Sequence, residues 1–269
     1  MTKEERGPLE GSGTLAEHSV LIEARVETVW AIVSDPAGFS EWLQGTARFS
    51  PEPGSPFEID FPRFQTAVRG EVLECDAARH RFAVTWGVES GAQAETFPVG
   101  SSKLELWLSS EAGGTRAHVR HSALPSETEA RNHEAGWRFH MSRLALFANR
   151  ADLSASLGPS LESWFGAWNE TDAEARSALL ARCCAPDVEF RDEYTSLRGR
   201  DLLGLHIGNT QHFIPGWRIE ASGTPRICRG EALASWGATG PEAQRFTGTH
   251  HLVADPDGTL RRVTSFWNP

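Results

Sequence analysis

Histidines on apolar faces are the side chains of the first half that best suit acid–base or ligand-binding chemistry. In the strand predicted over 115–123, His121 lies on the apolar face, opposite a face of arginines. In the helix predicted over 128–149, Trp137 and His140 belong to one stripe with helical spacing. Imidazole titrates near neutral pH and can transfer a proton or contact a ligand. The alternative is that this stripe marks half-exposed positions beside a buried tryptophan.

The second half offers three further acid–base candidates. His250 and His251 are adjacent in a predicted strand, so they point to opposite faces and one of them faces inward. His206 lies among leucines on a predicted helix, where it faces either a pocket or the sheet edge. Asp192 follows a short predicted strand, a position typical of a turn or cap residue. Two tryptophans are predicted to form pocket wall or core: Trp217 and Trp236.

Metal, nucleophile and phosphate chemistry are not expected. The ten histidines and four cysteines contain no HExxH or CxxC spacing, and Cys183 and Cys184 are adjacent rather than spaced as ligands. No glycine-rich turn joins a strand to a helix as a phosphate loop would. We therefore expect neither a bound metal nor a cofactor.

Composition narrows the class of protein. The chain has 269 residues, a formal net charge of −10, 39% apolar and 23% charged residues, which is typical of a globular protein with one large or two ordinary domains. Neither half is basic, so nucleic acid is not an expected partner. No apolar run is long enough for a membrane span, and the N-terminus lacks an apolar signal core, so a cytoplasmic location is expected. Ten tryptophans accompany a single tyrosine.

Hydrophobic periodicity predicts an α+β fold in both halves. The first half reads as a strand, two short helices, several antiparallel strands and a long helix. The second reads as three helices followed by a curved antiparallel sheet. Between them, small polar residues ending in Gly158-Pro159-Ser160 predict a linker. The expected organisation is a disordered tail at 1–14, a first domain at 15–149, a linker at 150–160 and a second domain at 161–269.

Short motifs in the first half occur in an order that is specific to one group of proteins. They are Val29 to Pro36 (VWAIVSDP), Glu41-Trp42, Gly70 to Glu74 (GEVLE), Phe82 to Trp86 (FAVTW) and Gly136-Trp137. With these motifs, residues 18–148 resemble the SRPBCC (START-like) superfamily, in the branch named after heat-shock-protein ATPase activator homologues. The resemblance implies an antiparallel helix-grip sheet around a long C-terminal helix, with a deep cavity that binds apolar molecules. His121, Trp137 and His140 are the expected ligand contacts there.

The second half carries a different set of motifs. They are Trp168-Asn169-x-x-Asp172, Ala185 to Asp192 (APDVEFRD), Arg198 to Leu203 (RGRDLL), Pro215-Gly216-Trp217 and Thr264 to Trp267 (TSFW). With them, residues 161–269 resemble the nuclear-transport-factor-2-like superfamily, especially its SnoaL-like polyketide cyclases and ketosteroid-isomerase-like members. The resemblance implies an α+β cone, in which helices close a curved antiparallel sheet around an apolar pocket. Such cones commonly dimerise through their sheets, so a homodimer is expected.

The second resemblance also implies roles for individual residues. Asp192 takes the place of the isomerase base, His250 that of an aspartic acid donor and Trp164 that of a tyrosine donor. A carboxylate surrounded by aromatic rings has a raised pKa and is a competent base near neutral pH. The ketosteroid isomerase site uses such a carboxylate. Only Asp192 has the same chemical type as the corresponding isomerase residue, so steroid isomerisation itself is not expected. The expected ligand contacts are Trp164, Trp168, His206, Trp217 and Trp236.

These resemblances predict a protein that binds a small apolar molecule in one or both cavities. Cofactor-free proton transfer of the cyclase or isomerase type, with Asp192 as base and His250 as acid or orienting group, is one hypothesis for the second domain. The alternative is a non-catalytic protein that binds a ligand or another protein, as a co-chaperone does. Fold alone does not decide between them.

Overall fold

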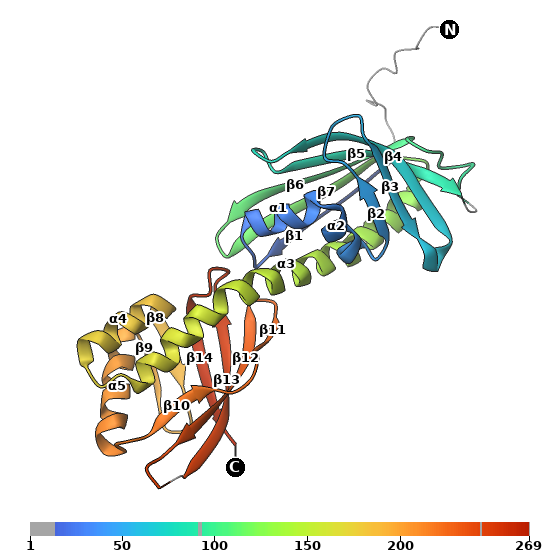
Figure 1. Ribbon diagram of the computed structural model, residues 1–269. Coiled ribbons are helices and arrows are strands. Elements are labelled where there is room, and N and C mark those ends of the chain that lie inside the picture. The colour runs from blue at the N-terminus through green and yellow to red at the C-terminus, as the bar shows by residue number, and fades with distance from the viewer. Residues whose placement is uncertain (1–13, 91–92, 243, 269) are drawn as a thin grey trace. The chain divides into compact units, whose positions relative to one another are not determined.

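The computed structural model describes residues 14–90, 93–242 and 244–268, which form two compact units (Figure 1). Among the described residues, unit 1 consists of those up to Ile22 and of Val26–Ala148. Unit 2 consists of Glu23–Arg25 and of the residues from Asn149 onward. Both units are α+β, as predicted. The tail expected at 1–14 lies outside the described residues, apart from Thr14 at the start of the first strand.

Unit 1 is built on a seven-stranded sheet with the strand order β1-β7-β6-β5-β4-β3-β2. All neighbouring strands pair antiparallel. In β6, Leu104, Leu106 and Leu108 are buried while the residues between them are partly exposed, as the alternation predicted. The strands are β1 (Thr14–Ile22), β2 (Thr46–Phe49), β3 (Pro56–Phe61), β4 (Thr66–Asp76), β5 (Arg81–Ser90), β6 (Ser102–Glu111) and β7 (Gly114–Leu124).

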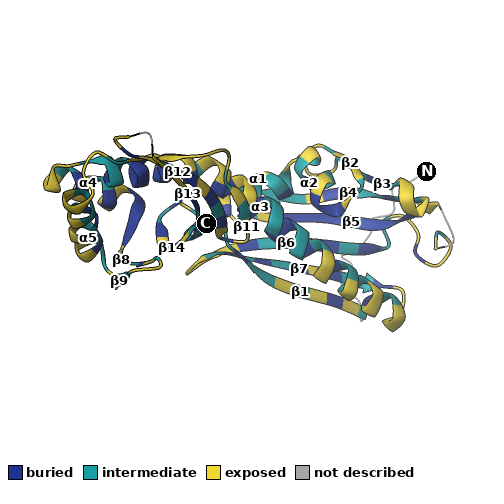
Figure 2. Cartoon of the chain, turned by 90° about the horizontal axis from the view of Figure 1, so that it is seen from below, coloured by how far each residue is buried: buried dark blue, intermediate teal, exposed yellow. Residues whose placement is uncertain are grey.

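Helices cover the apolar side of this sheet. The two short helices α1 (Val26–Ser34) and α2 (Pro36–Leu43) follow β1, and the Asp35 side chain caps α2 by accepting a hydrogen bond from the Gly38 N–H at 2.8 Å. The first part of α3 (Glu127–Asn169) contributes a buried stripe with helical spacing that includes Trp137, Met141 and Leu144. In Figure 2 the central strand β5 is dark blue along most of its length, because its residues are buried.

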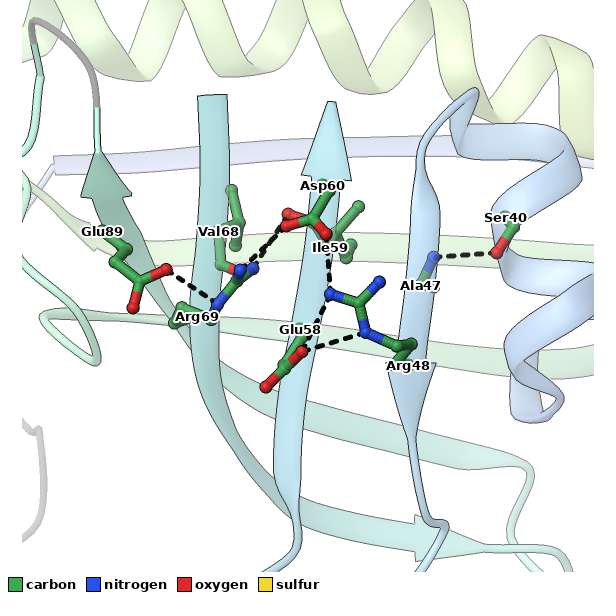
Figure 3. A network of polar contacts seen from close by, with 9 residues as sticks. All are labelled: Ser40, Ala47, Arg48, Glu58, Ile59, Asp60, Val68, Arg69 and Glu89. Atoms are coloured by element: carbon green, nitrogen blue, oxygen red, sulfur yellow. Dashed lines mark hydrogen bonds and ion pairs between the residues drawn. The ribbon is translucent and has the colours of Figure 1, made fainter. Parts of the chain in front are cut away.

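The opposite face of strands β2 to β5 carries a network of charges (Figure 3). Arg48 and Arg69 form ion pairs with Asp60 at 2.6 and 2.8 Å, respectively. Arg48 also pairs with Glu58, and Arg69 pairs with Glu89, both at 3.0 Å. The hydrogen bonds from Arg48 and then Arg69 lower the pKa of Asp60. Charges of alternating sign satisfy one another across the strands, so this face is a solvated surface rather than a site with an unmatched charge.

Unit 2 combines the second part of α3 with α4 (Ala173–Cys183), α5 (Arg200–Phe213) and a second sheet. The strand order is β10-β12-β13-β14-β8-β9, and β11 pairs with β12. The pair β14 and β8 is parallel, and the other pairs are antiparallel. The strands are β8 (Cys184–Arg191), β9 (Ser196–Arg198), β10 (Arg218–Ala221), β11 (Arg226–Cys228), β12 (Glu231–Thr239), β13 (Arg245–Ala254) and β14 (Leu260–Trp267).

The linker expected at 150–160 is helical in the structure, where α3 continues without a break through Pro159. Leu153, Leu157 and Leu161 recur every four residues, and all three are buried in the core of unit 2. This stripe holds the segment in a helix although its polar composition and Pro159 are typical of a break. The linker was predicted from the polar composition of the segment, and the helical spacing of its leucines was not taken into account.

A buried arginine joins the three helices of unit 2. Arg176 of α4 is 7% exposed and donates to the carbonyls of Glu170, at 2.8 Å, and Gly204, at 3.1 Å. It also donates to Gln211 Oε1 at 3.1 Å, and the Gln211 amide donates to the Trp168 carbonyl at 2.9 Å. A guanidinium beside the last carbonyls of a helix is favourable. Arg176 thereby connects the end of α3 with α5.

Candidate functional site

A pocket of about 360 Å³ lies in unit 2 and is walled mostly by aromatic side chains. Its walls come from α3, α5 and the strands of the sheet, so elements far apart in sequence build it together. This size and lining are typical of a small-molecule site. The lining residues are Trp168, Phe190, Asp192, Tyr194, His206, Thr210, Gln211, Ile214, Trp217, Arg218, Ile219, Trp236, Ala238, Phe246, His250, Ser265 and Trp267.

His250, like Ser265, is a buried polar side chain in this lining. It lies on β13, is 2% exposed, and has the rings of Phe165 and Trp236 stacked against it at 5.8 and 5.7 Å. Burial lowers its pKa to about 3, so the ring is neutral at physiological pH. The Trp164 indole N–H donates to His250 Nε2 at 3.2 Å.

This hydrogen bond fixes the tautomer of His250. An indole N–H can only donate, so Nε2 is the nitrogen with the lone pair, and the neutral ring carries its proton on Nδ1. No described residue accepts a hydrogen bond from Nδ1, which is buried. The lining of the pocket therefore includes an uncharged imidazole that is stacked against two aromatic rings.

Asp192 also lines the pocket, and it shapes the turn between β8 and β9. Its Oδ1 accepts hydrogen bonds from the backbone N–H groups of Tyr194, at 2.9 Å, and Thr195, at 2.6 Å. This is the turn-capping arrangement expected for an aspartate at such a position. Nearby, burial lowers the pKa of His206, while the charge of Asp192 acts in the opposite direction.

The structure brings six of the predicted site residues of unit 2 into one pocket. They are Trp168, Asp192, His206, Trp217, Trp236 and His250. Trp164 does not line the pocket: it is fully buried behind His250 and acts on it through the hydrogen bond. Several further lining residues were not predicted, among them Tyr194, Phe246, Ser265 and Trp267. Alternation along β14 places Ser265 and Trp267 on one face, but the pairing of Ser265 with His250 and of Trp267 with Gly248 depends on strand register.

Gly248 lets Trp236 lie flat against the sheet at the pocket. A Cβ at Gly248 would lie 2.3 Å from Trp236 Cζ2 and 2.3 Å from the Phe266 carbonyl oxygen. We expect Gly248→Ala to displace the indole and to lower the free energy of unfolding of unit 2 by about 2 kcal/mol, as overpacking does. Denaturant unfolding followed by tryptophan fluorescence measures this. Gly237→Ala is the control, because nothing lies within 4 Å of its Cβ; equal effects of the two substitutions would contradict the prediction.

Unit 1 has a smaller pocket of about 260 Å³, and it includes two of the predicted contacts, Trp137 and His140. His121 is not among its lining residues. Ser102 donates to the Trp86 carbonyl at 2.9 Å, so its oxygen accepts the hydrogen bond from His121 Nε2 at 2.8 Å. Burial, and to a smaller degree the neighbouring His133, lower the pKa of His121 well below its usual value. His121 is a neutral core residue behind the pocket wall.

Two further properties concern the whole described chain. Among the residues that the structure describes, no group of three or more His, Cys, Asp or Glu side chains could hold a metal ion. None of the described helices, the long α3 included, combines the length and the apolar character needed to cross a membrane.

The fold and the pockets together define a two-unit α+β protein, each unit of which has a pocket with aromatic walls. Residues 23–148, somewhat less than half of the chain, match the family model described as "Activator of Hsp90 ATPase homolog 1-like protein". This match confirms the resemblance predicted for the first half. A comparison with curated proteins found no match.

Several solved structures are similar to parts of this chain. A putative isomerase of the SnoaL-like family from Agrobacterium tumefaciens is 22% identical, with 43% of this chain and 99% of that chain covered and a TM-score of 0.40. An NTF2-like protein of unknown function from Exiguobacterium is 14% identical, with 40% and 98% covered and a TM-score of 0.34. A protein from Mesorhizobium loti is 20% identical, with 49% and 93% covered and a TM-score of 0.43.

Proposed function

We propose that unit 2 binds a small apolar molecule in its pocket. The observation that carries this proposal is the aromatic pocket of about 360 Å³ around the buried, neutral His250. Concave apolar sites with few polar groups bind ligands through burial of apolar surface and take specificity from those few groups. The pocket of unit 1 is smaller, at about 260 Å³.

Filling the pocket tests this proposal. Ala238 lines it, and Ala238→Trp places an indole in the space that a ligand would take. We expect the variant to bind the apolar probe fluorenone at least tenfold more weakly than the wild type, as measured by calorimetry. Ala173→Trp is the matched control, because Ala173 is exposed at the start of α4 and is not a lining residue. Equal binding by both variants and the wild type would reject the pocket as the site.

Proton transfer is the second candidate function, and the presence of Asp192 and His250 in one pocket favours it. Asp192 would remove a proton from the carbon next to a ligand carbonyl. His250 would act as the acid or orienting group for the oxygen on which negative charge develops.

Asp192→Asn separates this activity from binding. An asparagine keeps Oδ1 as the acceptor for the Tyr194 and Thr195 N–H groups, so the turn is retained, but it is no base. We expect 1-tetralone to bind within about twofold of the wild type. Deuterium exchange at the carbon beside its carbonyl, followed by NMR in heavy water, should slow at least 100-fold. If the wild type does not accelerate this exchange, or if the variant does so equally well, Asp192 is not a base for ketones.

A further inference from the structure

We infer that a groove along the second part of α3 is a further binding site of unit 2, and that its ligand is an elongated apolar molecule with a positively charged amine at one end. This groove is separate from the pocket around His250, since the two linings have only Ile219 in common. The inference therefore goes beyond the proposed function and is tested independently of it.

The first observation is the size and shape of the groove. It has a volume of about 450 Å³ and lies between α3 on one side and β10, β11 and the segment that joins them on the other. Along α3 its lining extends from Leu153 to Asn169, which corresponds to about 24 Å at the rise of an α-helix. The volume is sufficient for a small organic molecule, and the length favours an elongated one.

The second observation is why the groove is open. Strands β10 and β11 both pair with β12, but over the separate stretches Trp236–Thr239 and Glu231–Leu233, so this edge of the sheet is interrupted. Each wall carries a glycine: Gly158 on α3 and Gly223 between β10 and β11. A Cβ at either glycine would meet no atom within 4 Å. The interrupted edge and the two glycines thus leave accessible space beside α3.

The third observation is the apolar surface inside the groove. Leu153, Leu157, Leu161 and Phe165 recur every four residues on α3, are buried and line the groove. Ile219 of β10 adds a partly buried apolar side chain from the opposite wall. A ligand that covers this row gains free energy by burying its own apolar surface.

The fourth observation is the charge at the groove. Its described lining contains two charged residues, Glu162 of α3 and Glu220 of β10, and both are acidic and exposed. Arg218 lies 3.9 Å from Glu220, but the two side chains are 71% and 73% exposed, so water screens this pair. Each wall thus carries a carboxylate, and no basic residue belongs to the described lining. This arrangement attracts a cationic group and repels an anionic one.

Three probes of similar shape test the charge of the ligand by calorimetry: 4-phenylbenzylamine, 4-phenylbenzyl alcohol and biphenyl-4-carboxylate. We expect the wild type to bind the amine about fivefold more tightly than the alcohol at low ionic strength, and the carboxylate most weakly, because each exposed carboxylate contributes modestly. High salt should reduce this preference by screening. Equal binding of the amine and the alcohol, or tightest binding of the carboxylate, overturns the assignment of a cationic ligand.

A matched pair of double variants tests the two glutamates. In Glu162→Gln/Glu220→Gln, the amine and the alcohol should bind equally well. The control Glu174→Gln/Glu193→Gln removes two exposed glutamates that are not in the lining, so it changes the net charge equally and should retain the preference. If the first double variant retains the preference, or if the control loses it, Glu162 and Glu220 are not the groups that recognise the amine.

Tryptophan substitutions test the location of the site. Ser154→Trp and Ala221→Trp obstruct the groove from opposite walls, so either variant serves if the other does not fold. We expect each to bind the amine at least tenfold more weakly than the wild type. Ala155→Trp is the control, because Ala155 is exposed on α3 and is not a lining residue. It should bind within about twofold of the wild type, and so should Ala238→Trp, which obstructs the other pocket.

The remaining outcomes distinguish this site from the proposed one. Unchanged binding in both groove variants overturns the inference, and so does weaker binding in Ala238→Trp alone, which would assign the probe to the pocket around His250. If the wild type binds none of the three probes, the inference is also overturned. The proposed function then stands or falls separately on the binding of fluorenone.

Discussion

Acidification is expected to destabilise unit 2, with a loss of about 2 kcal/mol of unfolding free energy between pH 6.5 and pH 4.5. The pKa of His250 is about 3 in the folded protein, and an unfolded histidine has a pKa of about 6.5. Between these values the unfolded chain binds a proton that the folded protein does not. The free energy of unfolding therefore falls by about 1.4 kcal/mol for each pH unit below 6.5 and is fully retained above it.

Urea unfolding at a series of pH values tests this prediction. The free energy of unfolding should change less with pH in His250→Phe than in the wild type. An identical pH slope in His250→Phe and the wild type would show that His250 is not held neutral. The buried His121 gives unit 1 an acid sensitivity of the same sign.

Gly70→Ala is expected to have the largest effect on unit 1, with a loss of about 3 kcal/mol or more. Gly70 lies on β4, and a Cβ there would be 1.8 Å from the backbone oxygen of Thr85 on β5. Thr85 also accepts the Glu71 N–H at 2.9 Å through its hydroxyl, so neither strand can move aside without breaking the pairing. A glycine is required where two backbones approach this closely.

Gly136→Ala is the matched control in the same unit. Gly136 lies within α3, and nothing lies within 4 Å of its Cβ. Because alanine favours a helix over glycine, this substitution is expected to stabilise unit 1 by about 0.5–1 kcal/mol. Thermal unfolding of the two variants should therefore shift in opposite directions. A Gly70→Ala protein as stable as the wild type would show that β4 and β5 can adjust their spacing.

Local patterns predicted much of this fold because burial follows periodicity. The alternation of Leu104, Leu106 and Leu108 and the helical stripe at Trp137 appear in the structure as buried faces. The error at 150–160 has the opposite cause. There, polar composition was given more weight than the four-residue spacing of leucines that pack in the core of unit 2.

The pocket of unit 2 was less predictable because it depends on pairs that are distant in sequence. The family resemblance indicated Asp192 and His250, and both residues line the same pocket. The hydrogen bond from Trp164 joins residues 86 positions apart, and Ser265 meets His250 through the register of β13 and β14. Neither relationship leaves a local pattern, since register is set by the packing of the whole sheet. The turn-capping role of Asp192, in contrast, was predicted from its position after a strand.

The indole donor behind His250 has a consequence for how the protein responds to its surroundings. Most exposed histidines change charge within the range over which cellular pH varies. His250 keeps one proton on one nitrogen throughout that range, because its pKa is about 3 and its partner cannot reverse the hydrogen bond. The charge of this ring is thus insulated from physiological changes in acidity. Its contribution to the proposed ligand binding should therefore stay constant over the range of pH found in cells.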